Sequence, residues 1–271
     1  MIAASLIPAA ILAGDPAQVR TRLAAYSAVY ALLMLAGMRA LARHAPQPAT
    51  TAQAAVDATG GSSAEGWRAS VRELARNQAM RSLLLPYFLN ALSVAVPATL
   101  ALFYIADQLR APQLSGVFLA CYFGAAACGL PAWTALARKY GPLRCWRYGM
   151  ALSIAGFCGA ALLGHGDLTA YAFVCIAAGA ALGADLALPP VLLGQALGDR
   201  LGAGYGLFTL LGKLALALAG LALPLLSWLD YRPGQSGGIS LVLAYAVLPC
   251  LIKLLAIAAL SRCTDTTRSI P

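Results

Sequence analysis

The chain has 271 residues, 61% of them hydrophobic and 11% charged, with a net charge of +9 and a mean hydropathy of +0.75. So apolar a composition excludes an ordinary soluble domain and predicts an all-α integral membrane protein. The basic residues lie mostly between apolar stretches and form no groove interleaved with aromatic residues, so we expect a lipid bilayer and no nucleic acid as partner.

The N-terminal region contains two apolar stretches. Residues 1–13 are too short to cross a hydrocarbon layer that needs about 20 helical residues. No Lys or Arg precedes this stretch, which argues against a secretory signal peptide and favours a helix cut short at its start. Residues 23–41 are long enough for a full span. We therefore interpret residues 1–44 as the remnant of an N-terminal bundle, with one short and one full helix.

Residues 45–80 separate this remnant from the rest of the chain. Their first half, APQPATTAQAAVDATGGSSAEG, has the composition of a flexible linker. In the second half Trp67, Val71 and Leu74 recur at helical spacing, and the arginines face elsewhere. This pattern predicts either an amphipathic helix on the cytoplasmic membrane surface or an ordinary solvated helix.

Six further apolar stretches predict a six-helix transmembrane bundle over residues 81–262, followed by a tail at 263–271. The stretches cover residues 83–105, 114–136, 146–163, 168–197, 205–228 and 239–260. Their short connections predict antiparallel neighbours.

Small residues and prolines occur within these stretches. Glycines predicted to allow close helix packing are Gly116, Gly124, Gly129, Gly179 and Gly183. The Pro189–Pro190 pair lacks two amide donors and predicts a helix broken at membrane depth, near Asp185 and Leu186.

The distribution of basic residues predicts the orientation. With the loop at residues 39–81 inside, thirteen Lys and Arg residues fall on the inner side and four on the outer side. Arg20 and Arg22 oppose the rule, which leaves the first hairpin undetermined. We expect a multi-pass protein of the cell inner membrane with a cytoplasmic C-terminus.

Asp185 and Lys213 are the ionisable residues furthest from any loop. Lys213 interrupts the run YGLFTLLGKLALALAGLALPLLSW, and both residues lie roughly 15–20 Å from the inner end of their helices. A charge buried in lipid costs about 2.5–3.5 kcal/mol, so we hypothesise that the two share one polar cavity as an ion pair. Alternatively, Asp185 only neutralises Lys213 and stabilises the bundle.

Other polar residues lie at similar depth. Thr209 is one helical turn from Lys213, and its hydroxyl could bind a small cation that Lys213 replaces when the site is empty. Gln195 and Asn90 are candidates for substrate hydrogen bonds or, alternatively, for interhelical bonds. Lys253 can extend its side chain toward the inner face, so we assign it no function.

Motifs of other protein classes are missing from the sequence. The run Gly202, Gly204, Gly206 lacks the strand and the Lys-Ser/Thr pair of a nucleotide loop, and we interpret it as a flexible inner turn. No HExxH, GxSxG or catalytic carboxylate pair is found, so we expect no enzyme activity. The seven cysteines and two histidines show no metal-ligand spacing, and we expect neither a metal site nor a cofactor.

Several segments together resemble the C-terminal half of a major facilitator transporter, in particular of the glycoside–pentoside–hexuronide:cation symporter family. The segments are RNQAMRSLLLPYFLNALSVAVPATLALFYIAD, LPAWTALARKYGPLRCWRYGM, LALPPVLLGQALGDRLGAGYGLFTLLGKLALALAG and YRPGQSGGISLVLAYAVLPCLIKLLA. The eleventh-helix pattern with Thr209 and Lys213 is the most specific match.

The resemblance implies roles for named residues. Thr209 and Lys213 would lie beside a coupling cation, Na+ or H+, and Asp185, Asn90 and Gln195 would line the solute cavity. Arg138, Lys139 and Arg144 would form the inner gate. Residues 1–44 would be helices five and six of twelve, and Tyr171 and Phe173 are the aromatic residues that the tenth helix offers to a sugar ring.

The predicted function is therefore cation-coupled symport of a sugar-like or other small organic solute by alternating access. The chain would be a fragment that needs the missing N-terminal half or a second copy of itself. The alternative is a non-transporting membrane protein that assembles with a partner or regulates it.

Overall fold

A computed structural model describes residues 16–44, 78–197, 201–232, 234 and 238–268, and it divides the chain into two units, residues 1–69 and 70–271. The first unit contains helix α2, Pro16–His44. Its segment Thr21–Ala40 is long and apolar enough to span a membrane, in agreement with the span predicted at residues 23–41. The predicted short helix at residues 1–13 and most of the predicted loop, residues 45–77, lie outside the described residues.

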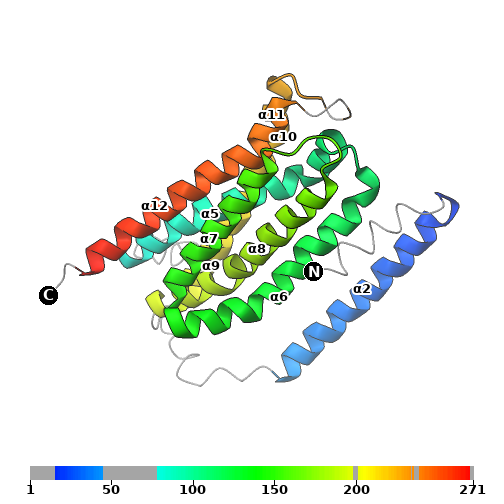
Figure 1. Cartoon of the computed structure of the whole chain (residues 1–271). Coiled ribbons are helices and arrows are strands. Elements are labelled where there is room, and N and C mark those ends of the chain that lie inside the picture. Colours follow the sequence, from blue (N-terminus) through cyan, green and yellow to red (C-terminus); the bar gives the residue numbers. More distant parts are fainter. Residues whose placement is uncertain (1–15, 45–77, 198–200, 233, 235–237, 269–271) are drawn as a thin grey trace. The chain divides into compact units, whose positions relative to one another are not determined.

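The second unit is a bundle of helices (Figure 1). Helix α5, Gln78–Phe103, continues into the π-helical segment η1, Tyr104–Gln108. A 3-10 turn, η2, Pro112–Leu114, leads into the following helices. These are α6 (Ser115–Tyr140), α7 (Pro142–Ala160), α8 (Leu168–Leu197), α9 (Leu201–Ala219), α10 (Ala222–Trp228), α11 (Ile239–Val242), the π-helical η3 (Leu243–Val247) and α12 (Leu248–Arg268). Within the described ranges there is no β-strand, and the predicted all-α fold is confirmed.

Six described segments are long and apolar enough to cross a membrane: the one in α2 and five in the bundle. Helix α7 is not among the six, so length and hydropathy do not support the span predicted at residues 146–163. The helix does form, but Arg144 and Arg147 in its first turns and its glycines lower its hydropathy.

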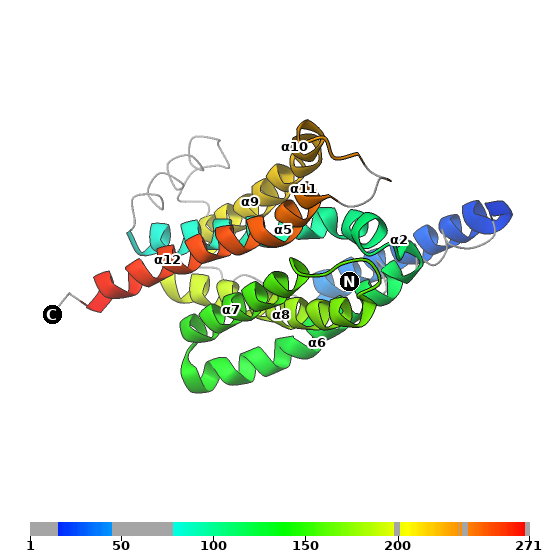
Figure 2. The same cartoon turned by 45° about the horizontal axis from the view of Figure 1, so that its top comes forward.

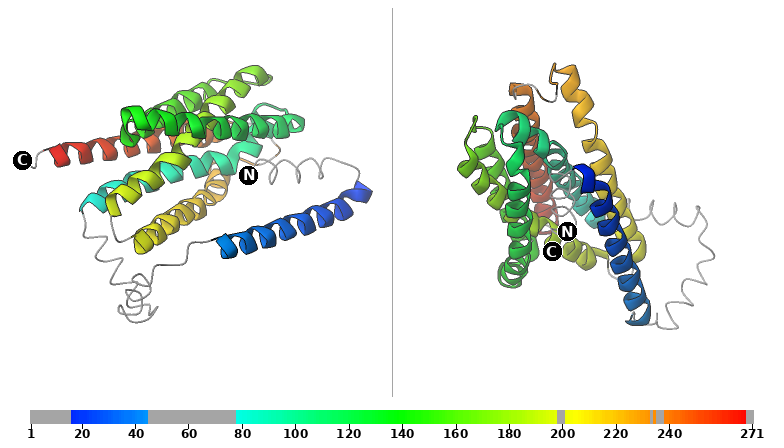
Figure 3. Two further views of the ribbon diagram at one scale, coloured as in Figure 1. Left: turned by 90° about the horizontal axis from the view of Figure 1, so that it is seen from below. Right: turned by 90° about the vertical axis from the view of Figure 1, so that its right-hand side faces the viewer.

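The bundle consists of two layers of three helices (Figure 2). One layer contains α6, α7 and α8, which pack on one another; in the other, α5 packs against both α9 and α12. Their axes are roughly parallel or antiparallel in both views of Figure 3. The α6–α7 turn, the start of α5 and the end of α12 lie at one end of the bundle, which agrees with the predicted up-and-down order.

Glycines allow α6 and α8 to approach backbone to backbone. A Cβ atom at Gly183 would lie 2.9 Å from the carbonyl oxygen of Ala126, and one at Gly129 would lie 3.0 Å from that of Ala180. Gly179 is tighter still against the backbone of Tyr122. The close packing predicted for these three glycines is confirmed. It is wrong for Gly116 and Gly124, which face open space, with no described atom within 4 Å of an added Cβ.

Two local predictions are corrected by the helices. Helix α8 stays continuous through Pro189 and Pro190, so the predicted break is wrong. The carbonyl of Pro190 accepts a hydrogen bond from the Tyr205 hydroxyl at 2.9 Å. The glycines at 202, 204 and 206 belong to the first turns of α9, so the predicted flexible turn is wrong.

The end of the bundle opposite the α6–α7 turn is held by a carboxylate in the π-helical segment η1. Asp107 is buried and accepts hydrogen bonds from the Tyr231 hydroxyl and from the backbone N–H of Gly234, at 3.1 Å to Oδ2. Burial raises the pKa of the Tyr231 phenol, and the hydrogen bond to Asp107 raises it further. On the opposite side, Gln108 Nε2 donates to the Leu163 carbonyl at 3.0 Å. Residues 107–108 thus fix the loops that precede α8 and α11.

Candidate functional site

Four polar side chains from three helices form a buried network in the bundle. Lys253 Nζ on α12 donates to Asp185 Oδ2 on α8 at 3.1 Å and to Ser153 Oγ on α7 at 2.9 Å. Trp146 Nε1, also on α7, donates to Asp185 Oδ1 at 3.0 Å. The side chains of Lys253 and Asp185 are 3% and 6% exposed. We call these four residues the Asp185–Lys253 network.

Local packing explains how these side chains meet. Trp146 and Ser153 are seven residues apart on α7, so they lie on the same face of the helix. Between them Gly149 lies against Ala184, the residue before Asp185, where an added Cβ would come within 2.5 Å of the Ala184 methyl group. Close α7–α8 contact therefore brings the Trp146 donor to the Asp185 carboxylate, and Ser153 on the same face accepts from the Lys253 ammonium group. Because Lys253 comes from the other layer, the network is a polar link between the two layers.

The predicted pairing of Asp185 with Lys213 is wrong. Asp185 pairs with Lys253, and Lys213 is exposed on α9 and forms no ion pair with any described residue. Consecutive helices were expected to be neighbours, but α8 packs mainly on α6 and α7 and only lightly on α9. The expectation that Lys253 extends to the inner face is also wrong, since its ammonium group is buried inside the bundle.

A sequence signal for Lys253 does exist. Cys250, Lys253, Ala256 and Leu260 recur at spacings of three, three and four residues, and all four are buried. This spacing defines one helix face. A lysine in the centre of an otherwise small and apolar face must find a partner inside the bundle, whereas a lysine on the opposite face could reach water.

Thr209 and Lys213 share an exposed face of α9. Both side chains are exposed, and Thr209 Oγ1 donates to the carbonyl of Tyr205 at 2.9 Å. Next to this face, Phe208 stacks on Tyr87 of α5 with ring centroids 3.8 Å apart. The Tyr87 hydroxyl lies beside Gly212, where an added Cβ would be 2.8 Å from it. Thr209 and Lys213 are thus available on the exposed face, and the Tyr87 hydroxyl lies at the neighbouring α5–α9 contact.

Asn90 and Gln195 differ in their surroundings. Asn90 on α5 is 2% exposed, and its Oδ1 atom has no hydrogen-bond partner among the described residues. Gln195 near the end of α8 is exposed. Among the described residues, no hydrogen bond joins these two amides to each other or to Lys213.

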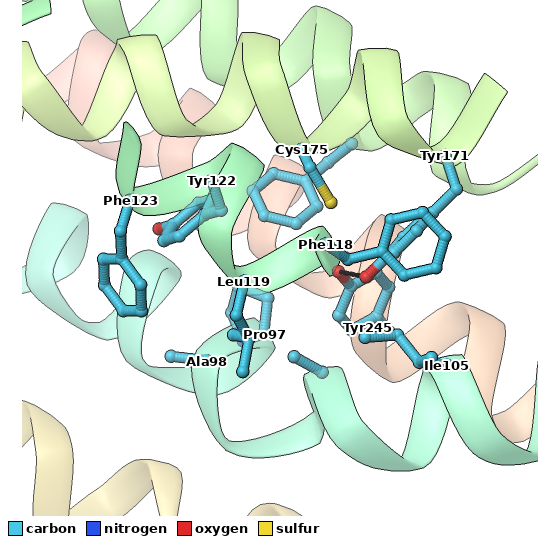
Figure 4. Close-up of a pocket in the computed structure, with 12 residues that line it drawn as sticks. Pro97, Ala98, Ile105, Phe118, Leu119, Tyr122, Phe123, Tyr171, Cys175 and Tyr245 are labelled. Carbon is cyan, nitrogen blue, oxygen red and sulfur yellow. Dashed lines mark hydrogen bonds between the residues drawn. The ribbon is translucent and has the colours of Figure 1, made fainter. Parts of the chain in front are cut away.

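Aromatic residues line a pocket in the half of the bundle that contains η1 and η3 (Figure 4). Its walls come from α5, η1, α6, α7, α8 and η3, and the cavity volume is about 100 Å³. The lining includes the Tyr171 that we expected near the outer end of the tenth helix, together with Phe118, Tyr122, Phe157 and Tyr245. Phe173 is exposed and does not belong to this lining.

A family model described as MFS/sugar transport protein matches residues 1–266, which is nearly the whole chain. The chain belongs to the MFS/sugar transport protein family. No curated protein and no solved structure matches it.

Membership of the MFS/sugar transport family confirms the resemblance to major facilitator transporters. It supports a sugar-type transport role, and it points to a transporter and not to an enzyme. Together with six helices that can span a membrane, it makes the chain a multi-pass membrane protein. Assignment to the glycoside–pentoside–hexuronide:cation symporters stays a prediction, as do the domain boundaries at residues 44, 80 and 262.

In this MFS protein the predicted inner-gate residues lie around the α6–α7 turn. Gly141 has a φ of +85°, a conformation that suits glycine, and it reverses the chain between Tyr140 and Pro142. Arg138, Lys139 and Arg144 are all exposed, and none makes an ion pair within the described part of the chain. Lys139 Nζ lies 5.2 Å from the centre of the Tyr140 ring.

Proposed function

We propose that the chain is one half of a cation-coupled transporter of sugar-like solutes, and that the exposed face of α9 borders its solute cavity. The observation that carries this proposal is the exposure of Lys213 together with Thr209 in the middle of a membrane-spanning segment. Apart from these two residues, the described side chains from Leu207 to Leu218 are apolar.

Energetics favour a wet environment for this face. A lysine that faced hydrocarbon at the middle of a span would cost about 2.5–3.5 kcal/mol. Among the described residues of the bundle, the Lys213 side chain has no ion-pair partner that could offset this cost. A water-filled cavity removes the cost, and alternating-access transporters have such a cavity near the bilayer midplane between two bundles.

The second wall of this cavity would come from another bundle, either an N-terminal half or a second copy of the chain. The resemblance to symporters supports Na+ or H+ as the coupling ion, with Thr209 and Lys213 beside it. Asp185 is excluded from direct contact with Lys213 by its pairing with Lys253, so we propose that it acts on the cavity only by fixing α8. Asn90 and Gln195 stay candidates for solute contacts.

The proposed setting is the cell inner membrane, with the α6–α7 turn and the C-terminus cytoplasmic. Exposed basic residues at this turn support the orientation, because cytoplasmic loops carry an excess of Lys and Arg. Arg138, Lys139 and Arg144 would act as the inner gate by pairing with acidic groups of the second bundle.

The alternative, a non-transporting assembly or regulatory protein, makes a different prediction for solute flux. Uptake of radiolabelled glucose, galactose, xylose and glucuronate would be measured in native membrane vesicles from cells with and without the chain, under an imposed Na+ or proton gradient. We expect gradient-dependent uptake of at least one sugar only when the chain is present. No difference for any sugar under either gradient would refute transport and favour the alternative.

The role of the α9 face is tested in the same vesicles by Lys213→Ala, with Leu214→Ala as the control. Leu214 is the next exposed residue on α9 and lies outside the proposed cation site. We expect Lys213→Ala to abolish the gradient dependence and Leu214→Ala to retain it. Equal gradient dependence in the two variants would remove Lys213 from the coupling site.

A further inference from the structure

Two cysteine thiols meet where helix α7 contacts helix α12. Cys158 Sγ on α7 lies 3.9 Å from Cys250 Sγ on α12, although the two residues are 92 positions apart in the sequence. Among the cysteines whose side chains the structure describes, no other two thiols are within hydrogen-bonding distance of each other. Helices α7 and α12 belong to different layers of the bundle (Figure 2), so this contact joins the layers.

Neighbouring hydrogen bonds hold the two helices in the register that brings the thiols together. Cys250 Sγ donates to the carbonyl of Ile154 at 3.7 Å, and Ile154 lies one helical turn before Cys158 on α7. Three residues beyond Cys250 on α12, Lys253 Nζ donates to Ser153 Oγ at 2.9 Å. The two sulfur atoms are therefore held side by side by contacts on successive turns. A small rotation of the two side chains would bring them to bonding distance.

The two thiols differ in exposure, and this difference decides which one reacts first. Cys158 is exposed, whereas Cys250 is 7% exposed. Cys128 on α6 is also exposed, but no described thiol lies within hydrogen-bonding distance of it. An oxidised cysteine without a neighbouring thiol proceeds from sulfenic to sulfinic and sulfonic acid, whereas one with such a neighbour condenses to a disulfide. Cys158 and Cys128 should therefore have different oxidation products.

We propose that Cys158 and Cys250 are a redox-active thiol pair, which an apolar hydroperoxide in the membrane converts into a disulfide between the two layers. The Cys158 thiolate attacks the terminal peroxide oxygen, the O–O bond breaks, and the alkoxide leaves and takes up a proton to become the alcohol. The Cys250 sulfur then displaces water from the sulfenic acid at Cys158 and forms the S–S bond. The two sulfur atoms together lose two electrons, and the peroxide gains them.

The disulfide would stabilise the bundle. It would join α7 to α12 close to the hydrogen bond between Ser153 and Lys253, and it would close a long loop of the chain. A crosslink of this kind restricts the unfolded chain, so the oxidised protein should resist unfolding more than the reduced protein. The inference goes beyond the proposed function and does not depend on it, because it concerns only the two thiols and their helices.

Oxidation of the purified full chain in lipid nanodiscs tests the pair. The reduced protein would be treated with cumene hydroperoxide, its remaining thiols would be alkylated, and its peptides would be identified by mass spectrometry. We expect a peptide pair joined through Cys158 and Cys250, with the mass of two hydrogen atoms lost, and we expect dithiothreitol to separate it. In the same sample Cys128 should gain oxygen atoms instead.

Matched variants assign the reaction to this pair. We expect Cys158→Ala and Cys250→Ala to abolish the disulfide and Cys128→Ala to retain it. In Cys250→Ala the thiol at Cys158 should become a sulfinic acid, because its partner is missing. In detergent micelles, oxidation should move the midpoint of denaturant unfolding to a higher concentration in the original protein and in Cys128→Ala, but not in Cys158→Ala. Because Cys158 is exposed, its replacement is tolerated even if Cys250→Ala does not fold.

Three results would overturn the inference. The first is a Cys158 that stays a thiol, or becomes a sulfinic acid beside an intact Cys250 thiol, under conditions that oxidise Cys128; the two thiols would then only fill space. The second is a disulfide that joins Cys158 to a different cysteine or to a second chain. The third is an unchanged midpoint of unfolding when the Cys158–Cys250 disulfide has formed, which would reject its role in holding the layers together.

Discussion

Lys253 and Lys213 are the same residue type in similar apolar surroundings, yet they have opposite environments. Lys253 is 2% exposed and bonded to a carboxylate and a hydroxyl, whereas Lys213 is exposed and has no ion pair among the described residues. One lysine links the two layers of the bundle. The other lies on the exposed face of α9.

The charge of Lys253 is used to hold the bundle together, whereas the charge of Lys213 is free to contact a solute or an ion. A buried ion pair contributes little net stability compared with apolar side chains, but breaking it exposes a full desolvation penalty. Removing one member of the Asp185–Lys253 network should therefore lower the free energy of unfolding strongly. Substitutions on the Thr209–Lys213 face should reduce gradient-driven uptake and hardly change the free energy of unfolding. Each prediction below tests one side of this contrast.

The largest effect is expected from Asp185→Ala. The change leaves the Lys253 ammonium buried without its carboxylate and leaves Trp146 Nε1 without its acceptor. We expect the free energy of unfolding to fall by about 3–5 kcal/mol, as for other broken buried pairs. Chemical denaturation in detergent micelles, followed by circular dichroism, measures it. A fall below about 1 kcal/mol would show that water or another group reaches Lys253.

A smaller loss is expected when the α6–α8 contact is widened. In Gly179→Ala the new methyl group would overlap the backbone of Tyr122, so the helices must separate, and we expect a loss of about 1–3 kcal/mol. Gly124→Ala is the matched control on α6, where an added Cβ meets nothing within 4 Å. There the helix should gain about 0.5–1 kcal/mol from the alanine. Equal effects of the two variants in the same denaturation assay would argue against close α6–α8 packing.

Replacing both charges should cost less than replacing one. In the double variant Asp185→Leu and Lys253→Met no charge is left buried, so we expect it to be within about 1.5 kcal/mol of the original protein. A double-mutant cycle with the single variants gives the coupling energy directly. If the double variant loses the sum of the two single effects, the two residues act independently and the network does not link the layers.

Much of this fold follows from hydropathy, since a span needs only length and apolar composition. The helices around residues 83–105 and 239–260 formed where the pattern predicted them. Hydropathy carries no information on which helices are neighbours, so it could not reveal that Asp185 pairs with Lys253 in preference to Lys213. The π-helical turns at Tyr104 and Tyr245 were also invisible, because they depend on tertiary packing and not on local composition.

The smallest effect on stability is expected from Lys213→Ala. An exposed side chain without an ion pair contributes little to folding, so the free energy of unfolding should change by no more than about 0.5 kcal/mol. Lys213→Arg keeps the positive charge but replaces the compact ammonium group by a planar guanidinium group. The larger group should occupy the position of a small cation less well. If Lys213 serves the coupling site, both variants should be stable and both should impair gradient-driven uptake, the arginine less so. A loss of stability above about 2 kcal/mol in Lys213→Ala would mean that this lysine, like Lys253, has a structural partner in the membrane, and the contrast between the two lysines would then disappear.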